Sequence, residues 1–167
     1  MLFRDDNDCL KFLGLLQRYL VEPKYPTKVR HKLYYEDIDL LCFCLMDNHI
    51  HLLLQQIEDG KKLAEIMHGL IISYTRYYNE KYPNNGPLFH GVYRARLIQN
   101  EQDLIGVSRY IHLNPSPKNP KEALIYPYSS VRCYTDPKNK SFDFVKTKAI
   151  LDYFHNSPKE YKKFLLA

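Results

Sequence analysis

The sequence predicts an α+β fold in which an antiparallel sheet carries helices on one face. Three observations lead to this prediction. Apolar residues recur at helical spacing in three stretches, two apolar stretches flank the turn-forming pair Asp47-Asn48, and a further strand-like stretch covers residues 91–99. With 45% hydrophobic and 26% charged residues in a chain of 167, the composition is that of one folded domain.

The first half of the chain predicts a helix followed by a hairpin. Residues 6–19 read as a helix because apolar residues, among them Leu13 and Leu16, recur near helical spacing, and Pro23 ends it. Residues 34–46 read as a strand that is apolar on both sides from residue 40 onward, as expected inside a sheet. The pair Asp47-Asn48 tolerates the positive φ angles of a tight turn, so residues 49–57 are the return strand.

The second half predicts the remaining helices and a third strand. A helix over residues 61–82 has a buried stripe that includes Ile66, Leu70 and Tyr74. The later elements are, in order, a turn-rich loop at 82–87, a strand at 91–99, a helix at 103–114 that Pro115 ends, and two short helices at 146–155 and 158–166. The order helix, strand, strand, helix, strand, helix is that of a ferredoxin-like (RRM-like) sandwich without its first strand.

Composition restricts the class of protein. No run approaches the roughly 18 apolar residues of a membrane span, and the N-terminus lacks the pattern of a signal peptide, so we expect a cytoplasmic protein without membrane contact. The four cysteines form no CxxC pair and are expected to be small buried thiols. A net charge of +5 and 15 tyrosines, several beside arginines, suit a nucleic-acid surface and equally suit an ordinary core.

Two histidines are candidate metal ligands. His49 and His51 are two residues apart on a predicted strand, so their side chains leave the same face. Two imidazoles on one face can hold a divalent cation. The same spacing also fits a solvated sheet face, and the pair alone leaves both interpretations open.

The helix at 103–114 carries a second candidate group. Tyr110 and Asn114 are four residues apart and therefore lie on one flank of the helix. Together they offer a phenol nucleophile and an amide oxygen as a third metal ligand, with coordination positions left open for a phosphate. A tyrosine at a helix edge and an asparagine at a helix end are also ordinary structural features.

Several segments resemble the HUH single-tyrosine transposases, which include the insertion-sequence and the REP-associated tyrosine transposases. The segment LMDNHIHLLLQ (45–55) resembles their HUH motif, and RYIHLNP (109–115) resembles their tyrosine helix. Three further segments resemble the following strand, a downstream element and the first helix of the REP-associated group: GPLFHGVYRARLI (86–98), YPYSSVRCY (126–134) and LFRDDNDCLKFL (2–13). Family members place a strand before this helix, so the resemblance implies a sheet that lacks the family's first strand here.

The resemblance implies that His49, His51 and Asn114 bind a divalent metal, Mg²⁺ or Mn²⁺, and that Tyr110 is the nucleophile. The implied reaction is transposase-like cleavage and transfer of DNA strands through a 5′-phosphotyrosine. The implied partner is single-stranded or hairpin DNA, bound by a monomer or homodimer at the nucleoid. Basic candidates for backbone contacts are Lys61, Lys62, Arg76, Arg94, Arg96 and Arg109.

Two other functions stay open at the level of sequence. One is a catalytically decayed, non-enzymatic module of the same fold that binds single-stranded nucleic acid. The other is a metal hydrolase that uses water, with Tyr110 only structural. In either case we expect residues 1–135 to form the main domain and residues 136–167 a C-terminal helical extension of it.

Overall fold

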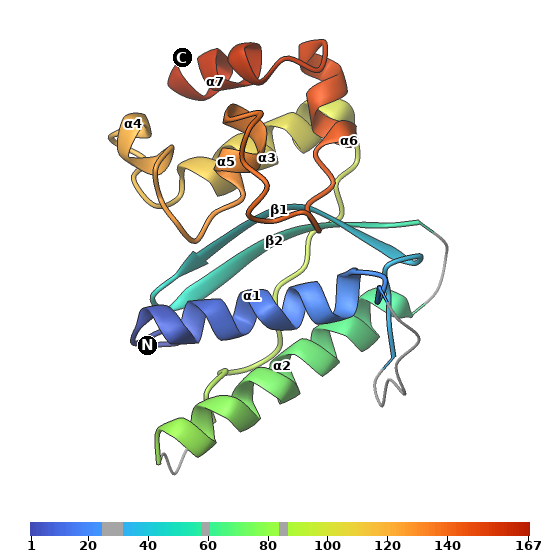
Figure 1. Cartoon of the computed structure of the whole chain (residues 1–167), viewed down its shortest axis with the longest axis vertical. Helices are drawn as coiled ribbons and strands as arrows, with labels where there is room; N and C mark the ends of the chain where they lie inside the picture. Colours follow the sequence, from blue (N-terminus) through green and yellow to red (C-terminus); the bar gives the residue numbers. More distant parts are fainter. Residues whose placement is uncertain (25–31, 58–60, 84–86) are drawn as a thin grey trace. The chain divides into compact units, whose positions relative to one another are not determined.

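The computed structural model describes residues 1–24, 32–57, 61–83 and 87–167 (Figure 1). The chain divides into two compact units, one formed by residues 1–39 and 56–95 and the other by residues 40–55 and 96–167. The elements are α1 (Asp6–Leu20), β1 (Ile38–Met46), β2 (His49–Gln56), α2 (Lys62–Lys81), α3 (Glu101–Leu113), α4 (Pro120–Ala123), α5 (Val131–Thr135), α6 (Lys148–Leu151), the 3-10 turn η1 (Asp152–Phe154) and α7 (Pro158–Leu166). The predicted α+β class with C-terminal helices is confirmed.

In the first unit, α1 and α2 lie side by side (Figure 1). The Asp5 carboxylate accepts a hydrogen bond from the Asp8 backbone N–H and thereby caps the start of α1. Further along, the Tyr19 hydroxyl lies 3.1 Å from the Ser73 hydroxyl, and Gly69 leaves room for the Tyr19 ring. The two helices are thus fixed to each other by side chains along their length.

A buried carboxylate anchors α1 to α2. Asp8 is fully buried and accepts hydrogen bonds from Lys81 Nζ at 2.7 Å, the Tyr77 hydroxyl at 2.9 Å, the Tyr82 hydroxyl at 3.1 Å and the Arg4 backbone N–H at 2.8 Å. Burial raises the pKa of Asp8, but the hydrogen bonds led by that from Lys81 outweigh it, so the pKa lies below its ordinary value. The carboxylate is therefore ionised and fully bonded at neutral pH.

Replacing Asp8 with asparagine is expected to lower the free energy of unfolding by roughly 2–4 kcal/mol at pH 7, because Lys81 loses its buried counter-charge. The depressed pKa means that this stabilisation is present above the unfolded-state pKa, about 4, and is lost as the pH falls through the folded-state value. Urea unfolding at pH 7 and pH 3 should show the gap between wild type and variant narrowing at the lower pH. Asp6→Asn, an exposed change on the same helix, serves as control.

The second unit is built on the hairpin of β1 and β2, and the helices of that unit, α3 to α7, gather over it (Figure 1). Residues 40–45 of β1 are all buried, as their continuous apolar run predicted. The turn falls at Asp47-Asn48 as expected. Positive φ angles were expected at this pair, and that prediction was wrong. In the described ranges the only non-glycine residues with positive φ are His155 and Asn156.

The edge of β1 that faces away from β2 is covered by the C-terminal segments. The Leu45 backbone N–H donates to the Tyr128 carbonyl at 2.9 Å, and the Ser130 N–H donates to the Phe43 carbonyl at 3.0 Å. A second segment adds a parallel bridge at Leu40, whose carbonyl accepts from the Lys146 N–H at 2.8 Å. These bonds satisfy an edge that would otherwise expose unpaired backbone groups.

The predicted third strand does not form. Residues 91–99 have no regular structure, and the sheet of the described residues has two strands. Val92 and Leu97 are 87% and 80% exposed, so neither side chain is buried by packing against a sheet. A segment with a strand-like pattern stays irregular when no sheet edge is available to pair with it.

Two further differences concern the ends of elements. The predicted helix at 146–155 consists of α6 and the short turn η1, and it ends where His155 and Asn156 take left-handed φ angles of 53° and 54°. Parts of the loop at 82–87 and the residue Pro26 lie outside the described residues. The four cysteines are free, as expected, and three of them are buried.

None of the helices in the described ranges has the length and apolar character needed to cross a membrane.

Candidate functional site

The hairpin brings the two candidate histidines together. His49 and His51 have ring centroids 4.8 Å apart, with the rings nearly perpendicular at 84°. The spacing of two on a strand puts both rings on one side of β2. His49 Nε2 lies 3.3 Å from Asn114 Oδ1, so the third predicted ligand joins the pair from α3. These three residues belong to the same compact unit.

Tyr110 lies beside the same cluster. Its ring centroid is 5.3 Å from that of His51, in an edge-on arrangement of 79°. The side chain remains 59% exposed, which leaves the phenol accessible to a large substrate. One turn of α3 separates Tyr110 from Asn114, and Asn114 is the last residue before Pro115 ends the helix. The helix end therefore presents the phenol and the amide next to the imidazoles.

One ring nitrogen of His51 lacks a hydrogen-bond partner among the described residues. This nitrogen, Nε2, is buried. Burial lowers the pKa of His51, and the nearby charge of His49 lowers it further. A neutral imidazole with a buried, unsatisfied nitrogen is costly unless a ligand occupies it.

His49 has an acceptor at each ring nitrogen. Its Nδ1 lies 2.7 Å from Asn48 Oδ1, while its Nε2 faces Asn114 Oδ1. A neutral imidazole has one N–H, so it can donate to only one of these two oxygens. A hydrogen bond from Nδ1 to Asn48 leaves the Nε2 lone pair beside an amide oxygen, which is an arrangement that a cation satisfies. Rotating the Asn114 amide would supply an N–H in its place.

The donor set fits a hard or borderline divalent cation. It consists of two imidazole nitrogens and one amide oxygen, and within the ranges that the structure describes no three His, Cys, Asp or Glu side chains gather at one point. Three protein ligands leave further coordination positions for substrate oxygens. Asn48, which orients His49, was not singled out from the sequence; its position directly before the histidine was the available signal.

A buried network holds α3 in place. His112 is fully buried, with Nδ1 2.7 Å from the Tyr161 hydroxyl and Nε2 2.8 Å from the Ser130 hydroxyl. The Ser130 hydroxyl also accepts from the Phe43 backbone N–H of β1 at 2.9 Å. Burial lowers the pKa of His112 to about 3, so the ring is neutral. The network connects the helix that carries Tyr110 to the strand beside the histidines.

Replacing His112 with phenylalanine is expected to lower the free energy of unfolding by roughly 2–5 kcal/mol, because Ser130 and Tyr161 each lose a buried partner. Thermal unfolding measures the effect. The same exchange at the exposed His68 should change the midpoint by little. A His112→Phe variant as stable as wild type would show that the network does not hold α3.

Two of the basic residues expected to contact DNA are already paired. Lys62 Nζ lies 3.2 Å from Asp37, and both Arg96 terminal nitrogens donate to Asp103 at 2.7 and 2.8 Å. Their charges are therefore largely compensated within the protein. To contact the DNA backbone, Lys62 and Arg96 would have to break their bonds to these carboxylates.

The other four basic candidates differ in accessibility. Arg109 donates through Nε to the Phe164 carbonyl at 3.2 Å and stacks on the Phe164 ring. Lys61, Arg76 and Arg94 are exposed, and none of them forms an ion pair with another described residue. No carboxylate in the described part of the chain therefore compensates the charges of these three residues.

Comparison with known families identifies a family that matches the chain. The family described as "Transposase IS200 like" matches residues 15–114, more than half of the chain and a range that contains both histidines, Tyr110 and Asn114. Comparison with curated proteins and with solved structures gave no significant match.

Proposed function

The chain belongs to the family of IS200-like transposases, and we propose that it cleaves and rejoins single-stranded DNA through a covalent bond to Tyr110. The observation that carries this proposal is the convergence of the Tyr110 ring, the His49 and His51 rings and the Asn114 amide at one place. An exposed phenol beside a set of cation ligands is what phosphoryl transfer to tyrosine requires.

The proposed reaction is an in-line displacement at a phosphodiester. The Tyr110 oxygen forms a bond to phosphorus while the bond from phosphorus to the 3′-oxygen breaks. The phenol loses its proton to the surrounding water, and the departing 3′-oxygen takes up a proton to become a free hydroxyl. The reverse attack by a 3′-hydroxyl of another strand end releases Tyr110 and completes strand transfer.

His49, His51 and Asn114 would hold a divalent metal, Mg²⁺ or Mn²⁺, against the reacting phosphate. When bound, such an ion neutralises charge on a non-bridging phosphate oxygen. His51 supports this role because its pKa is lowered and because its buried Nε2 has no hydrogen-bond partner in the described part of the chain. Asn48 would keep the His49 ring in the orientation that directs Nε2 to Asn114.

The proposal extends to the setting of the reaction. We place the reacting group in a main domain of residues 1–135, with 136–167 as its helical extension, acting on hairpin-forming DNA at the nucleoid. The hydrogen bond that the Ser130 hydroxyl accepts from Phe43 of β1, and the hydrogen bond between Tyr161 and His112, support a structural role for the C-terminal half.

The deciding experiment incubates the protein with a hairpin oligonucleotide and Mn²⁺ and analyses the products under denaturing conditions. A 5′-phosphotyrosine keeps the 3′-labelled fragment on the protein and releases the 5′-labelled fragment with a free 3′-hydroxyl. Cleavage without any protein-bound fragment would indicate a metal hydrolase. Tight binding without cleavage would indicate the non-enzymatic binding module.

A further inference from the structure

Helix α7 holds α3 on the side opposite to Tyr110. The Tyr161 hydroxyl of α7 donates to the Ser108 hydroxyl at 3.0 Å and lies 2.7 Å from His112 Nδ1. Tyr110 is two residues from both Ser108 and His112, and an α-helix turns by about 100° per residue. The Tyr110 side chain therefore leaves α3 about 200° around the axis from the side chains that α7 holds. Within this unit, α7 supports α3 from behind, and Tyr110 meets His51 in front.

Arg109, the residue before Tyr110, reaches the end of α7. Its Nε donates to the Phe164 carbonyl at 3.2 Å, and its guanidinium carbon lies 5.7 Å from the centre of the Phe164 ring. Phe164 belongs to the last turn of α7, where the carbonyls of a helix have no partner within the helix. A cation at this end also meets the partial negative charge of the helix. We call this contact the Arg109–Phe164 clamp.

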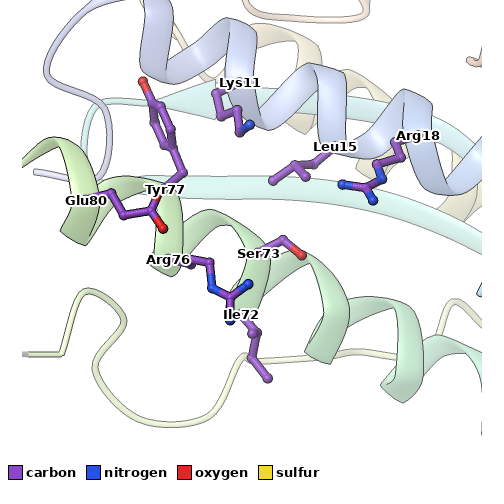
Figure 2. A pocket seen from close by; sticks show the side chains of 8 residues that line it. All are labelled: Lys11, Leu15, Arg18, Ile72, Ser73, Arg76, Tyr77 and Glu80. Carbon is purple, nitrogen blue, oxygen red and sulfur yellow. The ribbon is translucent and has the colours of Figure 1, made fainter. Parts of the chain in front are cut away.

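The surroundings of Arg109 differ from those of Arg76, another arginine considered for DNA contacts. Arg76 lies in a pocket between α1 and α2 of the first unit, with Lys11 and Glu80 also in the lining (Figure 2). It is exposed and forms no ion pair with a described residue. By contrast, the Nε and the flat face of the Arg109 guanidinium are occupied by α7. Arg109 thus fits a role inside the protein.

We propose that the Arg109–Phe164 clamp positions Tyr110 for its attack, so that α7 sets the rate of the covalent step. That Tyr110 is a nucleophile rests on the proposed function. The Tyr110 side chain is 59% exposed, so its place beside His51 depends mainly on how α3 is held. A misplacement of a reacting group by about 1 Å can slow a reaction about 100-fold. Arg109 and Phe164 are accordingly positioning residues, which act through α3.

The clamp can be altered without opening the core. Tyr161 is fully buried, so its replacement would disturb the interior of the unit. Arg109 and Phe164 are both half-buried at the edge of the contact between α3 and α7. Substitutions at these two positions therefore test the clamp in a folded protein.

The first test is Arg109→Gln, which removes the guanidinium. The rate of adduct formation is measured at saturating hairpin DNA and Mn²⁺, at a temperature where thermal unfolding shows the variant to be fully folded. This rate should fall at least about tenfold, while the DNA affinity stays near that of wild type. Arg132→Gln, at an exposed arginine on α5 of the same unit, is the control and should react as wild type does.

A contact of Arg109 with DNA predicts the opposite result. Loss of one phosphate contact would weaken binding and reduce its salt slope by about 0.7–0.9. The rate at saturating DNA would then remain that of wild type. This outcome would overturn the proposal.

The second test changes the other half of the clamp. Phe164→Tyr keeps the ring and should retain the wild-type rate, whereas Phe164→Leu removes the ring and should slow the covalent step. Because Arg109 and Phe164 act through one contact, the variant with both Arg109→Gln and Phe164→Leu should be no slower than the slower single variant. Losses that multiply in the double variant would overturn the proposal. The control is Phe142→Leu, at a half-buried phenylalanine that packs against Phe43.

A readout without chemistry separates this proposal from the proposed function. With 3-fluorotyrosine incorporated at position 110, fluorine NMR reports the surroundings of that ring, and Arg109→Gln should move its resonance towards that of free fluorotyrosine. If wild type forms no adduct but the resonance moves in this way, the proposed function fails and the clamp stands. If wild type forms the adduct and Arg109→Gln changes neither the rate nor the resonance, the clamp proposal fails alone.

Discussion

Replacing Tyr110 with phenylalanine is expected to abolish the covalent protein–DNA product while leaving the fold and the DNA affinity nearly unchanged. The substitution removes one oxygen and keeps the ring that packs edge-on against His51. Because the side chain is 59% exposed, loss of its hydroxyl leaves no buried group unsatisfied. The adduct should fall to the background of the assay, because the variant lacks the proposed nucleophilic oxygen.

Denaturing electrophoresis with a 3′-labelled hairpin measures this effect, and a binding assay on the same samples measures affinity. Tyr93→Phe is a suitable control, because Tyr93 is also a partly exposed tyrosine and lies in the other unit. An adduct at the wild-type level in Tyr110→Phe would show that another residue carries the DNA. Strong binding by wild type without any adduct would favour the binding module.

The local geometry of the site could be predicted from the sequence because it depends on short-range periodicity. Two residues on a strand share a face, and four residues on a helix share a flank. The hairpin that carries His49 and His51 was equally local, since a polar pair stands between two apolar stretches. Periodicity alone could not show that Asn114 lies 3.3 Å from His49, and the family resemblance supplied that pairing.

The misplaced third strand shows what periodicity leaves out. A strand requires a neighbouring edge as well as a suitable pattern, and that edge depends on the rest of the chain. In the structure, the available edge of β1 is taken by backbone near Ser129 and Val145, about 85 to 105 residues further along the chain. Residues 91–99 remain irregular, and no local signal distinguishes these outcomes.

The ion pairs of the basic residues could not be predicted from the sequence either. Lys62 and Arg96 were reasonable candidates for DNA contacts by charge alone, but each meets a carboxylate in the fold. Charge identifies a possible phosphate contact, and only the folded chain shows which charges are left uncompensated.

Replacing His51 with alanine is expected to weaken Mn²⁺ binding by more than about tenfold in the absence of DNA. The estimate follows from the tenfold to 100-fold losses seen when only an outer partner of a metal ligand is removed. His51 should matter most, because its buried Nε2 has no hydrogen-bond partner among the residues that the structure describes. The protein is titrated with Mn²⁺, and electron paramagnetic resonance measures the concentration of free Mn²⁺. This gives the affinity without reference to activity.

Companion variants assign the individual ligands. His49→Ala should also weaken Mn²⁺ binding, by less than His51→Ala does, whereas His68→Ala, at an exposed histidine on α2, should not. Asn114→Asp should strengthen binding, because a carboxylate replaces a neutral oxygen 3.3 Å from His49. Tyr110→Phe should bind Mn²⁺ as wild type does, since the role proposed for its hydroxyl is that of nucleophile and not of metal ligand. Unchanged affinity in both His49→Ala and His51→Ala would remove the cation from the mechanism and leave Tyr110 to act without it.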